Sequence, residues 1–463
     1  MHDDRLDPLE AVNPVDGRYR ETLRECSIYF SEHALIKQRL LVELRYLRSF
    51  LKAVGLNGDQ PKLMELEEKL AELSLKEAAE VKQLERKLGH DVVAATSYLG
   101  EKLEQHGLKH LKPLIHYGLT SDDVNNIAYA LAISGFINQT YTPQLLTLVE
   151  KLTALAETHK STPFLARTHG QPAVPTSFGS FVANYAYRLA NLAVKLNNLK
   201  LQAKLGGAAG DLAALKTTYP DVDWMRFAES FVNSLGLEHN PAATQTLPHE
   251  RMSEILTTFA IVNSVLSNLC RDLWMLGSLG LVEYARRAEE VHSSTMPQKK
   301  NPLAFENAEG ALDLSASMLS YMSTRLLSSR LHRDLSDSII KRFYGTALSL
   351  SLLGVKNIHK GLDNLHVNAE AMKKEVESNK QALMEAVQLT LRKHGVEDGY
   401  SLAAEAAEKG LERLRQQLLQ RGQNPEIIPQ TTEQYIQAAA EKAAHLLEKT
   451  KHIISYLRNQ LPR

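Results

Sequence analysis

Apolar residues recur every three or four positions through most of this chain, which is the spacing of one face of an α-helix. The clearest stripe predicts a single long helix and consists of Met252, Ile255, Phe259, Val262, Leu266, Leu269, Leu273 and Leu276. Similar stripes run through Phe178, Phe181, Tyr185, Leu189, Leu192, Leu196 and Leu199, and through Leu145, Leu148, Val149, Leu152 and Leu155. Alternating patterns typical of strands are scarce. Long helices bury such stripes against one another, so the sequence predicts an all-α fold around a bundle of long helices.

Two interruptions of the helical pattern suggest domain boundaries. The first interruption is Lys112-Pro113, which breaks a helical segment. The second is Gly361 and the short polar stretch that follows the bundle. We therefore expect an N-terminal helical domain at residues 1–115, a central bundle at 116–364 and a C-terminal helical domain at 365–463. Apolar stripes on several faces of the bundle also favour a homo-oligomer with closed symmetry.

Composition narrows the class of protein. Lys and Arg number 54 and Asp and Glu number 54, so the net charge is zero and no basic surplus indicates a nucleic-acid partner. Cys26 and Cys270 are the only cysteines, which argues against a disulfide framework and fits a reducing compartment. The N-terminus lacks the apolar core of a signal peptide, and we find no uninterrupted apolar run long enough to span a bilayer. We expect a soluble cytoplasmic protein without a membrane partner.

Four polar segments interrupt the helices, and we expect each where a helix begins or ends. The first is Thr120-Ser121-Asp122-Asp123, before a helix predicted at 124–137 with Ser121 as its N-cap. Such a segment is either a simple helix start or a place where hydroxyl and N–H groups bind a carboxylate or phosphate. The second is Arg167-Thr168-His169-Gly170-Gln171-Pro172, which places His169 in a turn where it can transfer a proton. A lone histidine can equally be structural.

The third segment is rich in glycine and reads Lys204-Leu205-Gly206-Gly207-Ala208-Ala209-Gly210-Asp211. It is either a helix C-cap or a place where backbone closely approaches a ligand. It does not fit G-x-G-x-x-G and no strand pattern precedes it, so we reject a dinucleotide-binding interpretation.

The fourth segment, residues 293–302, reads Ser-Ser-Thr-Met-Pro-Gln-Lys-Lys-Asn-Pro and brings hydroxyls, cations and an amide into one loop. Alone it could be a solvated surface loop. Other cationic or imidazole groups are Arg18 beside Tyr19 and His90 beside Asp91. Arg333 and Arg342 also lie near one another in the sequence, with the hydroxyl of Ser338 between them. No H-E-x-x-H or common ligand spacing indicates a metal, and no G-x-S-x-G indicates acyl transfer.

These segments carry a resemblance to a known family. Residues 293–302 resemble the signature loop of the fumarase/aspartase superfamily, and Thr120-Ser121-x-Asp123, Thr168–Pro172 and Gly206–Gly210 match its other shared segments in order and spacing. Asn13–Tyr19, Thr244-Gln245 and Arg333-Asp334-x-x-Asp337-Ser338 resemble the bacterial branch of the adenylosuccinate lyase family. The resemblance covers essentially the whole chain. It implies the three-domain helical lyase fold, a homotetramer with each active site shared by three subunits, and no metal or organic cofactor.

The resemblance also implies a reaction and the residues that perform it. Adenylosuccinate would give AMP and fumarate, and the succinyl-carboxamide ribotide (SAICAR) would give its carboxamide (AICAR) and fumarate. Ser293 would be the base and His169 the acid, while Lys299 and Asn301 would hold the developing anion and Ser294 would also bind the substrate. The nucleotide phosphate and sugar would be held by Arg18, Tyr19, Arg333, Ser338 and Arg342. The succinyl group would be held by Thr120, Ser121 and Gln245, with His90, Asp91 and His116 supporting the phosphate side and His169.

Three positions depart from the family pattern. His292 stands where glycine commonly precedes the two serines, Asp211 replaces a frequent Asn or Thr, and Gln298-Lys299-Lys300 is more similar to argininosuccinate lyase. Argininosuccinate lyase is therefore the alternative function, although its substrate carries no phosphate. A non-catalytic helical scaffold is a third alternative, which the presence of every expected acid, base and cation disfavours.

Overall fold

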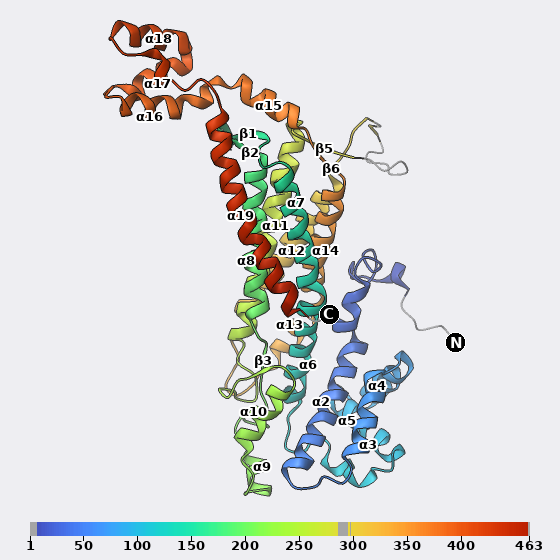
Figure 1. The fold of residues 1–463 in the computed structure, drawn as a ribbon. Helices are drawn as coiled ribbons and strands as arrows, with labels where there is room; N and C mark the ends of the chain where they lie inside the picture. Colours follow the sequence, from blue (N-terminus) through green and yellow to red (C-terminus); the bar gives the residue numbers. More distant parts are fainter. Residues whose placement is uncertain (1–6, 286–294, 297, 462–463) are drawn as a thin grey trace.

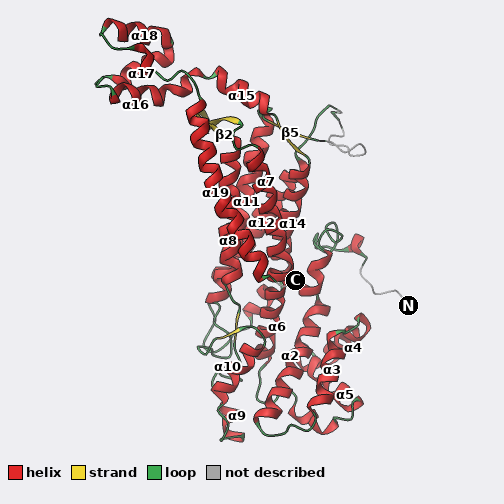
Figure 2. Ribbon diagram, viewed as in Figure 1, coloured by secondary structure: helices red, strands yellow, loops and turns green. Residues whose placement is uncertain are grey.

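The computed structural model describes residues 7–285, 295–296 and 298–461. The structure is 69% helical, and the described strands make three two-stranded sheets (Figure 1 and Figure 2). The predicted all-α class is confirmed at the level of a mostly helical lyase fold. Separate clusters of buried apolar residues lie in the N-terminal helices, the central bundle and the C-terminal helices. The exact boundaries at 115 and 364 stay a prediction.

The N-terminal helices lie beside the bundle, and those between Ile36 and Leu111 enclose a leucine-rich core of their own. They are 3-10 helices η1 (Pro8–Glu10) and η2 (Arg24–Cys26), helices α1 (Ser27–Phe30), α2 (Glu32–Ala53), α3 (Gln60–Ala71), α4 (Leu75–Leu88) and α5 (Asp91–Gln105), and 3-10 helix η3 (Lys109–Leu114). Ser74 caps α4 in a capping box with Glu77, which satisfies backbone donors at that end. Helix α2 is buried on both sides because it also contacts α6 of the bundle.

The central bundle consists of long helices that run side by side. Its helices are α6 (Ser121–Phe136), α7 (Thr142–Thr158), α8 (Phe178–Asn198), α11 (Glu250–Ser278), α12 (Leu303–Arg325) and α14 (Tyr344–Asp363). Shorter helices are α9 (Ala213–Thr218), α10 (Trp224–Ser234) and α13 (Ser336–Lys341). The predicted stripe of α11 is confirmed, since all eight of its apolar positions are buried. Helix α12 packs between α11 and α14, while α7 packs against α8.

Two details of the bundle differ from the sequence prediction. The helix expected at 124–137 begins three residues earlier, so Thr120 is the N-cap and Ser121 is the first helical residue. The helix then continues through one π-helical turn, η4 (Ile137–Tyr141), directly into α7. The early start is stabilised by the Asp123 carboxylate, which accepts a hydrogen bond from the Thr120 N–H at 2.8 Å.

The short strands connect helix ends. Strands β1 (Pro163–Thr168) and β2 (Gln171–Ser177) form an antiparallel hairpin between α7 and α8. Strand β3 (Gln202–Ala203) pairs in parallel with β4 (Glu238–His239), and β5 (Val282–Tyr284) pairs antiparallel with β6 (Leu365–Val367). The expectation that no strand precedes the glycine-rich segment is wrong, because β3 lies directly before Lys204. Pairing with a strand distant in sequence creates β3.

The C-terminal helices project from one end of the bundle and then return to it (Figure 1). They are α15 (Ala369–Ser378), 3-10 helix η5 (Lys380–Leu383), α16 (Met384–Lys393), α17 (Gly399–Lys409), α18 (Leu411–Gln420), 3-10 helix η6 (Pro425–Ile427) and α19 (Glu433–Gln460). Helices α16 to α18 enclose a small core of their own. Helix α19 runs back along the bundle and packs against α8 and α7.

Helix α11 is the one helix of the described ranges that is long and apolar enough to cross a membrane by length and composition. Most of its apolar window is buried among the other bundle helices. The central helix of a water-soluble bundle meets the same criterion, so this one helix is weak evidence for a membrane span.

A buried chain of polar side chains crosses the bundle. The Tyr141 hydroxyl lies 3.0 Å from the Ser351 hydroxyl, which donates to Oδ1 of Asn263 at 2.6 Å. Nδ2 of Asn263 donates to the Ser315 hydroxyl at 2.9 Å, and that hydroxyl donates to the Ala347 carbonyl at 2.7 Å. The chain satisfies every one of these buried polar groups and links η4, α11, α12 and α14.

Replacing Asn263 with leucine should lower the free energy of unfolding by about 1–3 kcal/mol, because the Ser351 and Ser315 hydroxyls lose their buried partner. Urea unfolding measures this as a lower midpoint. Ser264→Ala is the matched control, because Ser264 lies one residue away and bonds only within its own helix, to the Ala260 carbonyl. We expect the control to stay within about 0.5 kcal/mol of the wild type. Equal midpoints for the two variants would contradict a stabilising role for the polar chain.

Candidate active site

Asp123 fixes the glycine-rich loop to the start of α6. Its fully buried carboxylate contacts the buried ammonium of Lys204 at 2.7 Å. The same carboxylate accepts hydrogen bonds from the N–H groups of Gly206 at 2.8 Å and Gly207 at 3.0 Å. At Gly207 the backbone φ is +67°, and a β-carbon there would come within 2.9 Å of the Gly118 carbonyl. Glycine at position 207 thus allows the loop to lie close to the Gly118 backbone, while an approach of this loop to a ligand stays a prediction.

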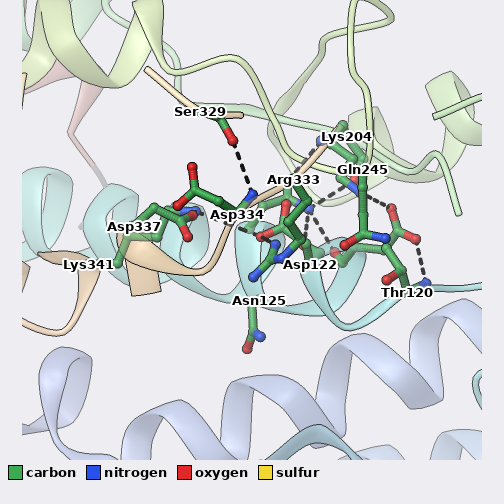
Figure 3. A network of polar contacts seen from close by, with 12 residues as sticks. Thr120, Asp122, Asn125, Lys204, Gln245, Ser329, Arg333, Asp334, Asp337 and Lys341 are labelled. Carbon is green, nitrogen blue, oxygen red and sulfur yellow. Dashed lines mark hydrogen bonds and ion pairs between the residues drawn. The ribbon is translucent and has the colours of Figure 1, made fainter. Parts of the chain in front are cut away.

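Asp122 connects the same helix start to α13. Its buried carboxylate lies 3.2 Å from Nη1 of Arg333 and 3.7 Å from Nζ of Lys341. Nζ of Lys341 also contacts Oδ2 of Asp337 at 2.6 Å, one helical turn earlier. Figure 3 shows these four side chains together beside Lys204 and Gln245. The cations hold the pKa of Asp122 below its usual range, although burial alone would raise it.

Gln245 reaches this cluster from the segment before α11. Its Nε2 donates to the carbonyl of Ala208 in the glycine-rich loop at 2.8 Å. The neighbouring Thr244 hydroxyl donates to the carbonyl of His332 at 3.0 Å, directly before Arg333. Residues 244 and 245 therefore link the glycine-rich loop to the segment that leads into α13.

The first residue of α5, Asp91, lies against the next cationic group, Arg342. Nη2 of Arg342 lies 3.5 Å from the Asp91 carboxylate, and Nη2 of the buried Arg39 lies 2.6 Å from it. Burial would raise the pKa of Asp91, but Arg39, the Val92 N–H, His90 and Arg342 together hold it below the usual range. His90 caps α5, its Nδ1 accepting from the Val93 N–H at 3.4 Å, and its ring is half exposed.

His116 forms an ion pair close to this cluster. Its Nδ1 lies 2.5 Å from the buried Glu43 carboxylate, and its backbone has a left-handed φ of +57°. Burial would lower the pKa of His116, but Glu43 and then Asp123 outweigh burial and raise it. His116 is therefore held in place by α2 and favours the charged imidazolium form.

Arg18 and Tyr19 lie in a turn beside the bundle. The Arg18 guanidinium stands 6.0 Å from the centre of the Tyr19 ring, and Tyr19 packs partly against the bundle core. Nδ2 of Asn13 donates to the Thr346 hydroxyl at 3.2 Å, which fastens the turn to the first residues of α14. Because α14 begins two residues after Arg342, the turn lies next to the cluster.

His169 lies far from these groups in the same chain. It occupies the exposed turn between β1 and β2, where its φ is +54° and that of Gly170 is +74°. The expected turn is thus confirmed, but it belongs to a hairpin and not to a helix end. Arg167 in β1 forms an ion pair with Glu375 of α15. Helix α8 has 21 residues and a length of about 31 Å, and it separates this hairpin from β3 and Lys204 (Figure 1).

The described part of the signature loop, residues 295–296 and 298–302, also lies at that distant end. Ser293 and Ser294, like His292, fall outside the described residues, so their predicted roles stay predictions. Lys299 is exposed, and its N–H donates to the Met296 carbonyl at 3.0 Å. Asn301 lines a cavity of about 250 Å³ together with Tyr284 and Lys360. Helix α12, 23 residues and about 34 Å long, separates Asn301 from the segment of Arg333.

The structure thus gathers most of the predicted substrate-binding residues at one end of the bundle. The gathered residues are His90, Asp91, Thr120, Ser121, Gln245, Arg333, Ser338 and Arg342, with Arg18 and Tyr19 beside them. His169, Lys299 and Asn301 lie toward the opposite end.

Several charged residues of the cluster were not singled out from the sequence. Asp122, Lys341 and Lys204 lie in or beside helices, where charged residues are usually exposed. His249, before α11, is also buried, and neither ring nitrogen has a hydrogen-bond partner among the described residues. Burial first, then the charge of Lys341, lowers the pKa of His249 to about 3. Of these residues, only Lys204 could have been suspected from the sequence to be buried, because it stands in an otherwise apolar and glycine-rich run.

Solved structures share the architecture of this chain. A fumarate lyase from Mesorhizobium sp. BNC1 matches with a TM-score of 0.76 and 18% identity, covering 92% of this chain and 97% of that one. The β-carboxy-cis,cis-muconate cycloisomerase of Acinetobacter calcoaceticus sp. ADP1 matches with a TM-score of 0.71 and 19% identity, covering 92% and 98%. At this identity the likeness establishes the fold. A lyase family model also matches residues 39–313, so the chain is a lyase of the fumarase/aspartase superfamily.

Sequence relatives define the family within that class. A model for the adenylosuccinate lyase C-terminal region matches residues 329–442. The adenylosuccinate lyase of Legionella pneumophila (strain Corby) is 37% identical over 404 residues, which cover 85% of this chain and 88% of that protein. The adenylosuccinate lyase of Escherichia coli (strain K12) is 36% identical over 401 residues, covering 85% and 88%. The chain belongs to the adenylosuccinate lyase family.

Proposed function

We propose that this chain cleaves adenylosuccinate to AMP and fumarate, and SAICAR to AICAR and fumarate, in purine nucleotide biosynthesis. The observation that carries the proposal is the similarity to relatives named adenylosuccinate lyase over 85% of the chain. The cluster of guanidinium groups supports it, because a phosphate-bearing substrate requires preorganised positive charge. We further propose that the enzyme acts in the cytoplasm.

In this proposal the two sides of the cluster hold the two halves of the substrate. Arg333, Ser338 and Arg342, with Arg18 and Tyr19, hold the phosphate and sugar. Thr120, Ser121 and Gln245 hold the succinyl group. His90 and Asp91 orient Arg342 on the phosphate side.

The chemical step is a β-elimination. Ser293 removes the proton from the carbon beside a carboxylate, Lys299 and Asn301 stabilise the resulting aci-carboxylate, and Ser294 also binds the substrate. His169 protonates the leaving nitrogen. The proposal requires no metal or organic cofactor, and the described residues contain no group of three or more His, Cys, Asp or Glu side chains that could hold a metal ion.

We also propose a homotetramer in which three subunits contribute to each active site. Within one chain, helices about 31 and 34 Å long separate the acid and the anion-holding residues from the cluster. Exposed apolar side chains on α11 and α12 support association, because such patches are usually covered by a partner. These side chains are Ile261, Trp274, Met275, Leu314 and Tyr321.

Fumarate release from three substrates tests the function. We expect the purified protein to release fumarate from adenylosuccinate and SAICAR, followed by absorbance, and not from argininosuccinate. Argininosuccinate lyase is the second candidate because of Gln298-Lys299-Lys300. Release from argininosuccinate alone would refute the proposal.

A further inference from the structure

Lys341 is a buried cation that lies between the two proposed substrate-binding sides. It is 6% exposed, and its ammonium contacts Asp337 at 2.6 Å and Asp122 at 3.7 Å. Asp122 follows Ser121 directly, and Lys341 precedes Arg342 directly. One ion pair therefore spans from the segment proposed to bind the succinyl group to the segment proposed to bind the phosphate.

The charges of this cluster balance only when Lys341 is present. Asp122 and Asp337 supply two negative charges, while Lys341 and Arg333 supply two positive charges. Removing Lys341 leaves two carboxylates against one guanidinium in a buried environment, where unpaired charge is costly. Arg333 would then be drawn fully onto the carboxylates.

Arg333 is incompletely engaged in the present arrangement. Its Nη1 lies 3.2 Å from Asp122. Among the described residues, this nitrogen, Oδ2 of Asp122 and Oδ1 of Asp337 have no hydrogen-bond partner. Buried polar atoms are seldom left unsatisfied unless a ligand or a function uses them. Because Lys341 shares the charge of Asp122, the Arg333 guanidinium keeps bonding capacity for an anionic ligand.

We propose that Lys341, acting through Asp122, is a positioning residue that holds Arg333 in place for the substrate phosphate. The inference rests on the proposed function and deepens it. In this role Lys341 makes the site bind phosphorylated purine ligands more tightly than unphosphorylated ones. Lys341 itself does not contact the substrate.

Lys341→Met tests the role with paired ligands that differ only in the phosphate. We expect the KM for adenylosuccinate and the inhibition constant of AMP to rise together by about tenfold to 10²-fold, since a displacement of about 1 Å can cost 10²-fold. The inhibition constant of adenosine should stay unchanged, and kcat should fall less than KM rises. Lys341→Arg should restore most of the affinity for AMP.

Lys69→Met is the matched control. Lys69 forms an ion pair with Glu65 at the same four-residue helical spacing and at 2.7 Å, but on the exposed surface of α3. The control should leave all three constants unchanged. If Lys341→Met does not fold, the charge-balanced double variant Lys341→Met with Asp337→Asn replaces it, and the same selective loss of AMP affinity is expected.

Two results would overturn the inference. One is a folded variant in which the affinities for AMP and adenosine change by the same factor or not at all. The other is a wild-type enzyme that releases no fumarate from adenylosuccinate, which refutes the proposed function and the inference with it. A wild type active on adenylosuccinate with an unselective Lys341→Met variant refutes the inference alone.

Discussion

His169→Asn should lower kcat by a factor of about 10²–10⁴ with little change in KM, because the variant loses the proposed general acid. Asparagine is the appropriate replacement, since it tolerates the left-handed backbone that His169 adopts at φ +54°. The hairpin should therefore keep its shape. Steady-state rates of fumarate release measure the effect.

A histidine on another surface provides the control for this variant. His110 is also exposed and contacts Asp59 at 2.8 Å, so His110→Asn should leave kcat unchanged. Mixing inactive His169→Asn chains with inactive Arg333→Met chains should restore part of the activity, because the proposed sharing of sites between subunits would leave some mixed sites with both groups intact. A variant affected only in KM would contradict the role as an acid. Failure of mixing to restore activity would argue that one chain supplies both residues.

The long helices were predictable because their burial is periodic. All eight positions predicted for the stripe of α11 are buried, since a bundle buries one face of each helix along its whole length. The π-helical turn at Ile137–Tyr141 was not predicted, because apolar residues continue through it without a change of pattern. Strand β3 was missed because two residues pairing with Glu238–His239 carry no local signal.

The candidate site was predictable only where its residues interrupt the helical pattern. Thr120, His169 and the glycine-rich segment stand out as polar or flexible groups in a helical chain. Asp122 and Lys341 do not, because an Asp in a first helical turn and a Lys at a helix end are common on solvated helices. Their burial arises from the packing of α13 against the start of α6, a contact between residues more than two hundred positions apart in the sequence.

Lys204→Met should lower the free energy of unfolding by about 3–5 kcal/mol, because the Asp123 carboxylate would stay buried without its counter-ion. Both partners are fully buried in the native protein. The backbone N–H groups of Thr120, Gly206 and Gly207 still donate hydrogen bonds to Asp123 in this variant. These donors are neutral, so they do not replace the positive charge of Lys204. Urea unfolding followed by circular dichroism measures the loss as a lower midpoint.

Lys151→Met makes the same chemical change in a partly exposed ion pair, between Lys151 of α7 and Asp363 of α14. This control should cost about 0–1 kcal/mol, since water screens and solvates both charges. The double variant Lys204→Met with Asp123→Asn should be more stable than Lys204→Met alone, because no unpaired charge remains. Equal unfolding midpoints for Lys204→Met and Lys151→Met would show that the buried pair contributes little. Since Asp123 also anchors the loop whose Ala208 carbonyl holds Gln245, we expect Lys204→Met to weaken binding of the succinyl group as well.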